Sequence, residues 1–169
     1  MKLLARLAML VTILVFSFGV AVLWITAFLG ETEMLMDTLE LPLDTPVAPM
    51  WALIVGLGMM LLALGCLAAA FWALDRILVL RDPRGFATLA LYLRRCAYAF
   101  MAFWVSNTVI LSLLPVLLTL HLPAEQRPTS ELFPLDIEIV FLVLAVVFLA
   151  ISQSLRQAQD IADENSQFL

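Results

Sequence analysis

Four long apolar runs constrain this chain more than any other feature. They cover residues 7–29, 51–78, 97–120 and 135–155, and no acidic, basic or histidine side chain stands in the middle of any of them. About 20 residues of helix, at about 1.5 Å each, cross a hydrocarbon core about 30 Å thick. Hydrophobic residues make up 64% of the 169 residues, against roughly half in a soluble domain. We therefore expect an integral membrane protein with four spans.

The membrane also dictates the fold class. Because the bilayer core offers no water to the backbone, each span has to satisfy its own hydrogen bonds as a helix. Short connections favour antiparallel neighbours, so the expected fold is all-α: a four-helix up-down-up-down bundle in one domain, residues 1–169, with a cytoplasmic tail at 156–169. The alternative for the first run is a cleaved signal peptide. The apolar region of such a peptide is only about 7 to 15 residues long, and no Ala-x-Ala-like site precedes Gly30.

The distribution of charge predicts the orientation. Of the nine basic residues, eight fall on one side under this topology and only Arg127 falls on the other. Basic side chains collect on the cytoplasmic side of membrane proteins, so both termini and the 75–96 connection are expected there, and the outer connections are acidic. Trp24, Trp51 and Trp72 lie near span ends, where the headgroup layer favours their rings. The eight basic residues are Lys2, Arg6, Arg76, Arg81, Arg84, Arg94, Arg95 and Arg156.

Small residues along the second run predict a close helix contact. Gly56, Gly58, Gly65 and Ala69 have little or no side chain, so a neighbouring backbone can approach them closely. Packing within the bundle is the simpler interpretation, and a contact with another membrane protein is the alternative.

In the third run, Asn107 carries an amide that is costly in contact with lipid. We therefore expect Asn107 to face protein and to hydrogen-bond to a neighbouring helix.

Residues that carry chemistry are scarce. The motifs of zinc metalloproteases, serine hydrolases and phosphate-binding loops are missing, so no catalytic residue is expected and the protein is not predicted to be an enzyme. His121 is the only histidine, which leaves no bis-histidine haem or histidine-based zinc site within one chain. Cys66 and Cys96 are isolated and are expected to pack as small apolar residues. No cofactor and no metal are therefore expected.

Two of the helices are expected to leave the bilayer with an apolar face. The fourth helix is predicted to continue to Glu164, and the third is predicted to begin near Thr88, before the membrane. Both faces are predicted to bind a partner protein, and the alternative is that they cover each other. Their residues are Ile151, Leu155, Ala158 and Ala162 on the fourth helix and Leu89, Tyr92 and Leu93 on the third.

Two short segments carry a resemblance to a known group of proteins. They are Arg84-Gly85-Phe86 followed by Leu93-Arg94, and Leu149-Ala150-Ile151-Ser152-Gln153-Ser154-Leu155 leading into Ala158 and Ile161-Ala162-Asp163-Glu164-Asn165. Together with the four-span plan, they resemble an uncharacterised family of small bacterial membrane proteins that are often encoded beside an Xre-type helix-turn-helix regulator. Ala87 stands where that family usually has a small hydroxyl residue, and Cys96-Ala97 replaces an expected glycine region. The resemblance implies the four-span topology and a regulatory partner, and it supplies no catalytic residue.

These features predict a non-enzymatic protein of the bacterial inner membrane that binds another protein, as the membrane partner of a regulator or as an accessory subunit. The expected partners are membrane lipid and a second protein in the membrane or the cytoplasm. Self-association stays open, and no direct binding of nucleic acid is expected. The alternative function is a permease for an ion or small solute, with a path near Asn107 and a kink at Pro115. The lack of charge inside the spans argues against transport, because coupled transporters and proton relays depend on such groups.

Overall fold

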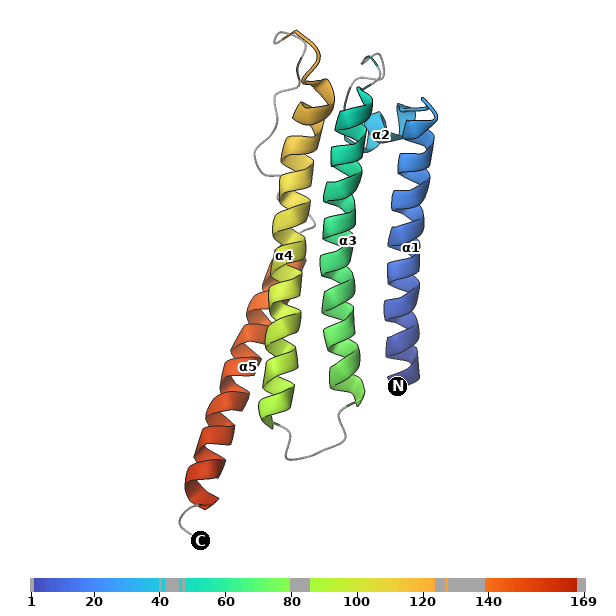
Figure 1. The fold of residues 1–169 in the computed structure, drawn as a ribbon. Coiled ribbons are helices and arrows are strands. Elements are labelled where there is room, and N and C mark those ends of the chain that lie inside the picture. Colours follow the sequence, from blue (N-terminus) through green and yellow to red (C-terminus); the bar gives the residue numbers. More distant parts are fainter. Residues whose placement is uncertain are drawn as a thin grey trace. The chain divides into compact units, whose positions relative to one another are not determined.

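The computed structural model describes residues 2–39, 41, 46, 48–79, 86–123, 127 and 139–166. The order along the chain is α1 (Lys2–Phe28), α2 (Glu33–Thr38), α3 (Met50–Val79), α4 (Phe86–Thr119) and α5 (Ile139–Ser166), coloured from blue to red in Figure 1. No strand occurs among the described residues. The all-α fold expected from the sequence is confirmed for this part of the chain.

Four of these helices, α1, α3, α4 and α5, are long and apolar enough to cross a membrane. They contain 27, 30, 34 and 28 residues, which exceeds the roughly 20 residues that a span needs. Large apolar side chains point away from the protein along them, as Phe18 and Leu62 do with exposed fractions of 72% and 63%. Such surfaces suit acyl chains rather than water. The chain is therefore organised as a multi-pass membrane protein.

The helix ends agree with the expected spans at some points and extend them at others. α3 begins and ends within one residue of the expected 51–78. α4 begins at Phe86, well before the expected span at 97–120, and α5 continues to Ser166, past the predicted Glu164. The extensions of the third and fourth helices beyond their apolar runs are thus confirmed. The expected start of the fourth span, at 135, lies outside the described residues.

The turn after α1 depends on one glycine. Gly30 has φ +91°, a conformation that side chains disfavour. Its N–H donates to the carbonyl of Ala27, and the N–H of Glu31 donates to the carbonyl of Thr26. These two bonds form a Schellman motif, which satisfies carbonyls that the helix end leaves open. α1 therefore stops where the acidic connection begins.

The short helix α2 was not predicted, because the acidic and proline-broken connection after the first run suggested irregular backbone. Its six residues carry three apolar side chains, and two of them, Leu35 and Met36, are 0% and 1% exposed. Leu39 and Leu41, which follow α2, are also buried. Among the described residues of this connection, most apolar side chains therefore pack within the chain, whereas Met34 is exposed.

The chain forms two compact units. The first unit comprises Met1–Met9, Cys66–Trp104 and Ile137–Leu169, and so contains the start of α1, the end of α3, the first part of α4, and α5. The second unit comprises Leu10–Gly65 and Val105–Asp136, and so contains the rest of α1, α2, the first part of α3 and the end of α4.

Aromatic rings fill the core of the first unit. Phe100 of α4 is 3% exposed, and its ring centroid lies 6.4 Å from that of Phe71, 5.9 Å from that of Phe141 and 6.1 Å from that of Phe148. Phe103 packs edge-to-face on Phe141 at 4.9 Å. Pairs in such geometries each contribute about 0.5 to 1.5 kcal/mol beyond the burial of their area. The rings therefore tie α3, α4 and α5 together.

Candidate functional site

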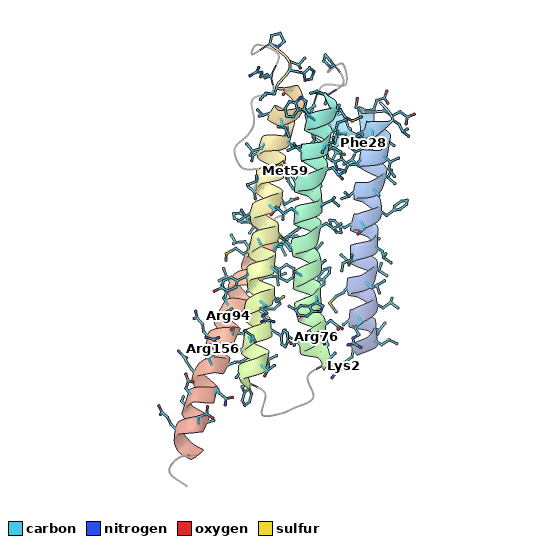
Figure 2. The ribbon with its side chains drawn as sticks, viewed as in Figure 1. Lys2, Phe28, Met59, Arg76, Arg94 and Arg156 are labelled. Atoms are coloured by element: carbon cyan, nitrogen blue, oxygen red, sulfur yellow. The ribbon has the colours of Figure 1, made fainter. Side chains whose placement is uncertain are left out.

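Basic residues from four helices belong to the first unit. Figure 2 shows Lys2, Arg76, Arg94 and Arg156 at a similar level across this unit, and they belong to α1, α3, α4 and α5 respectively. A band of basic side chains at one level is typical of the headgroup layer, where ammonium and guanidinium groups meet lipid phosphates while their stems follow the apolar surface.

One ion pair joins α1 to α3 within this band. The Nε of Arg6 donates to Oδ1 of Asp75 at 2.6 Å, and its Nη2 donates to Oδ2 at 3.3 Å. The side chains are 47% and 38% exposed, so the pair contributes only about 0 to 1 kcal/mol to stability. Its larger consequence is electrostatic, because it neutralises the one described carboxylate that adjoins Arg76 in the sequence.

Two further arginines lie over aromatic rings. The Cζ of Arg76 lies 5.3 Å from the ring centroid of Trp72, and the Cζ of Arg95 lies 5.7 Å from that of Tyr92. The two rings meet edge-to-face, with centroids 6.2 Å apart and an interplanar angle of 73°. We call the set Arg76, Trp72, Tyr92 and Arg95 the arginine–aromatic row. It connects the end of α3 to the first part of α4.

The arginine–aromatic row was not predicted, although part of it has a signal in the sequence. Trp72 and Arg76 are four residues apart, and Tyr92 and Arg95 are three apart, which are the spacings that bring side chains together on a helix. Each residue carried a separate interpretation, Trp72 as a headgroup anchor and Tyr92 as part of a docking face. The Trp72–Tyr92 contact between helices has no local signal.

Two buried hydrogen bonds fix α4 against its neighbours in the first unit. The hydroxyl of Ser152, 2% exposed, donates to the carbonyl of Ala90 at 2.8 Å. The thiol of Cys96, which is fully buried, donates to the carbonyl of Ala70 at 3.6 Å. Cys66 is half-buried, and both cysteines are free. Ser152 therefore marks a point at which α5 is held against α4.

Past Ser152, α5 runs beyond the described part of α4. Four residues of α4, starting at Phe86, precede Ala90, whereas fourteen residues of α5, Gln153–Ser166, follow Ser152. The surplus of ten residues corresponds to about 15 Å of helix at about 1.5 Å per residue. We call Gln153–Ser166 the α5 tail.

The predicted partner-binding residues differ in how far their side chains are exposed. On α4, Leu93 is 8% exposed, and Leu89 and Tyr92 are half-buried. On α5, the apolar stripe is half-buried at Leu155 and exposed elsewhere. Its exposed members are Ile151, Ala158 and Ala162.

The predicted packing residues of α3 also differ from one another. Gly56 is buried, and a Cβ atom placed on it would lie 2.5 Å from Cη2 of Trp24 and 2.6 Å from Cδ1 of Leu114. Gly58 and Gly65 are exposed, and a Cβ atom on either would meet nothing within 4 Å. Ala69 is exposed as well. The close approach therefore occurs at Gly56, where α1, α3 and α4 meet.

Trp24 departs from the expected headgroup position. Its side chain is 2% exposed, and its Nε1 has no hydrogen-bond partner among the described residues. Trp51 and Trp72 are each 48% exposed, as residues in a headgroup layer would be. The space left by Gly56 explains the difference, because the six-membered ring of Trp24 fills it.

Asn107 and Pro115 belong to the second unit. Asn107 is half-buried, and its expected hydrogen bond to a neighbouring helix stays a prediction. Pro115 lies inside α4, which continues to Thr119, and the Thr119 hydroxyl donates to the carbonyl of Pro115 at 2.7 Å. An open apolar groove of about 370 Å³ in this unit is bounded by α1 and α2, and neither Asn107 nor Pro115 lines it.

No group of three or more His, Cys, Asp and Glu side chains that could hold a metal ion occurs in the part of the chain that the structure describes.

Comparison of the chain with family models, with curated proteins and with solved structures finds no match. The arginine–aromatic row and the α5 tail are therefore the two features on which a functional interpretation can be built.

Proposed function

We propose that this chain is a non-enzymatic protein of the bacterial inner membrane that binds another protein through the α5 tail. The observation that carries the proposal is the surplus length of α5. The tail continues as helix for about 15 Å beyond the described start of α4, and Ala158 and Ala162 of the apolar stripe lie in that surplus with their side chains exposed.

The alternative that the two cytoplasmic faces cover each other fits the outer part of the tail poorly. The contacts of α4 with α5 include Ala90 with Ser152 and Phe103 with Phe141, so residue numbers rise on one helix as they fall on the other. In this register Phe86, the first residue of α4, lies near Arg156. Described α4 residues therefore end before Ala158 is reached.

The same contacts support the antiparallel arrangement of neighbouring helices. The pair Arg6–Asp75 joins the start of α1 to the end of α3, which adds a second pair of helices running in opposite directions. We propose an up-down-up-down bundle with both termini in the cytoplasm, on the combined support of these contacts and the excess of basic residues on that side. The resemblance to small four-span proteins encoded beside regulators makes a cytoplasmic regulator one class of partner to test.

The topology predicts the location of reporter domains fused along the chain. Fusions after Leu80 and after Gln167 are expected to report the cytoplasm, and fusions at Asp44 and Gln126 are expected to report the outside. The reason is that eight of the nine basic residues lie on one side. Paired alkaline phosphatase and fluorescent-protein fusions measure this. An outside signal at Gln167 contradicts an even number of spans.

The α5 tail predicts a loss of partner binding without a loss of fold. The double variant Ala158→Glu with Ala162→Glu places two carboxylates on the exposed stripe, and we expect it to abolish recovery of the partner in a quantitative cross-linking pull-down. The bundle should stay intact, because the spans satisfy their own backbone hydrogen bonds without the tail. Thermal unfolding in detergent checks this second expectation.

The matched control changes the charge by the same amount on the opposite face of the helix. At about 100° per residue, Gln153 and Gln157 lie about 160° and 120° from the mean direction of Ala158 and Ala162, and we expect this variant, Gln153→Glu with Gln157→Glu, to recover the partner normally. Equal recovery by both double variants contradicts docking through the stripe. A parallel fall of stability and recovery in the stripe variant assigns these residues to packing within the chain.

A further inference from the structure

We propose that the arginine–aromatic row is a binding site for the phosphate headgroup of an anionic phospholipid. The site lies in the first unit, on the surface formed by the end of α3 and the first part of α4. The proposal does not depend on the function proposed for the α5 tail, since lipid binding is measured on the isolated protein.

The geometry of the row orients two guanidinium groups. Arg76 lies over Trp72 and Arg95 over Tyr92, and the two rings hold each other at 73°. A guanidinium that lies over the face of a ring still has N–H groups available as donors. Those donors form forks that match phosphate oxygens in pairs. Two such forks therefore lie on one surface. Because the rings already restrict the two arginine side chains, these lose less conformational entropy on binding a phosphate than unrestrained arginines would.

The charge of the row is not compensated by its described surroundings. Asp75, which precedes Arg76, is engaged by Arg6 through contacts of 2.6 and 3.3 Å. Among the described residues, neither Arg76 nor Arg95 forms an ion pair with a carboxylate. The row therefore presents two positive charges to a ligand, and a ligand with a net negative charge is favoured over a zwitterionic one.

The surroundings of the row identify the ligand as a lipid. Arg76 and Arg95 are exposed, Trp72 is 48% exposed, and Tyr92 is half-buried, so the row opens to the outside of the chain. It lies at the end of two membrane-crossing helices, where indole and phenol rings favour the headgroup layer. The anions of that layer are lipid phosphates, and basic surfaces between spans bind such headgroups.

The test compares two double variants that remove the same charge. Arg76→Gln with Arg95→Gln removes the row, whereas Arg94→Gln with Arg156→Gln removes two arginines of the same unit that lie over no ring among the described residues. Figure 2 shows Arg94 and Arg156 at the level of Arg76. Binding of phosphatidylglycerol and phosphatidylcholine to the purified full chain is measured by native mass spectrometry and by the shift of the thermal transition.

We expect phosphatidylglycerol to bind the unchanged chain and the control variant, and to bind the row variant about 30-fold more weakly, roughly fivefold for each guanidinium. Arg76→Lys with Arg95→Lys keeps the charge but loses the planar forks, and is expected to give an intermediate loss. This variant also serves if the glutamine variant fails to fold. Inorganic phosphate alone is expected to give no stabilisation.

Three results overturn the proposal. An equal loss in the control variant shows that diffuse positive charge is sufficient. Equal binding of phosphatidylcholine and phosphatidylglycerol shows that the site does not select an anion. Stabilisation by inorganic phosphate as strong as that by the lipid assigns the row to a soluble anion. Each result leaves the α5 tail unaffected, because the pull-down of the tail variants is independent of lipid.

Discussion

Replacing Gly56 by alanine is expected to lower the free energy of unfolding by about 1 to 3 kcal/mol, the range for overpacking a filled core. The added Cβ would lie 2.5 Å from Cη2 of Trp24 and 2.6 Å from Cδ1 of Leu114. Trp24 is 2% exposed and Leu114 is 0% exposed, so neither side chain can move aside into solvent, and each has to displace its packed neighbours. Reversible unfolding in mixed detergent micelles measures the change.

Gly58 provides the matched control, because it lies two residues away on the same helix. A Cβ atom on Gly58 would meet nothing within 4 Å, so Gly58→Ala is expected to stay within about 0.5 kcal/mol or to stabilise the helix. Trp24→Phe shortens the ring that meets Gly56 and should recover part of the loss in the double variant, with a coupling of about 0.5 kcal/mol or more. Equal effects of Gly56→Ala and Gly58→Ala would exclude a steric origin.

The contrast between these two glycines shows where sequence reasoning reached its limit. The four small residues of α3 looked equivalent, yet Gly56 is buried while Gly58, Gly65 and Ala69 are exposed. In a soluble helix the buried face is marked by apolar residues, but in a membrane the lipid-facing side is just as apolar. Hydropathy therefore identifies the helices and says little about which face of each helix packs.

The presence of four long apolar helices was predictable for the opposite reason. The bilayer requires a minimum length of apolar residues, and it requires each span to form its own backbone hydrogen bonds. The first requirement is visible in the length and composition of each run, and the second makes each run a helix. The extension of α5 past its apolar run was predictable from helical spacing alone, since Ile151, Leu155, Ala158 and Ala162 recur along one face. Whether α4 covers that face depends on the residue at which α4 begins. The structure places this start at Phe86, and the helical spacing of apolar residues does not predict it.

The arginine–aromatic row and the buried Trp24 have a common physical explanation. Both depend on side chains from different helices, Trp72 with Tyr92 in one unit and Trp24 with Gly56 in the other. Contacts between helices are set by register and by the shape of the neighbouring surface, and a single sequence records neither. The contacts within a single helix, such as Tyr92 with Arg95, could have been predicted from their spacing of three or four residues.

Replacing Phe100 by alanine is expected to lower the free energy of unfolding by about 2 to 4 kcal/mol. Its ring contacts those of Phe71, Phe141 and Phe148, and its side chain is 3% exposed. Removing it leaves a cavity where three helices meet, and such truncations cost about 3 to 5 kcal/mol in soluble cores. The expected value is lower because helix association in lipid lacks the hydrophobic contribution that water supplies.

Phe18 provides the control position for Phe100. It distinguishes the loss of the ring contacts in the core from the loss of an aromatic ring in general. It lies on α1 and is 72% exposed, so Phe18→Ala removes a ring that faces lipid and is expected to change stability by no more than about 0.5 kcal/mol. Phe100→Leu should fall between the two, because it fills part of the cavity but loses the ring contacts of about 0.5 to 1.5 kcal/mol each. Steric-trapping measurements of unfolding in bicelles give these values. If Phe100→Ala cost no more than Phe18→Ala, the aromatic core would not be what holds α3, α4 and α5 together.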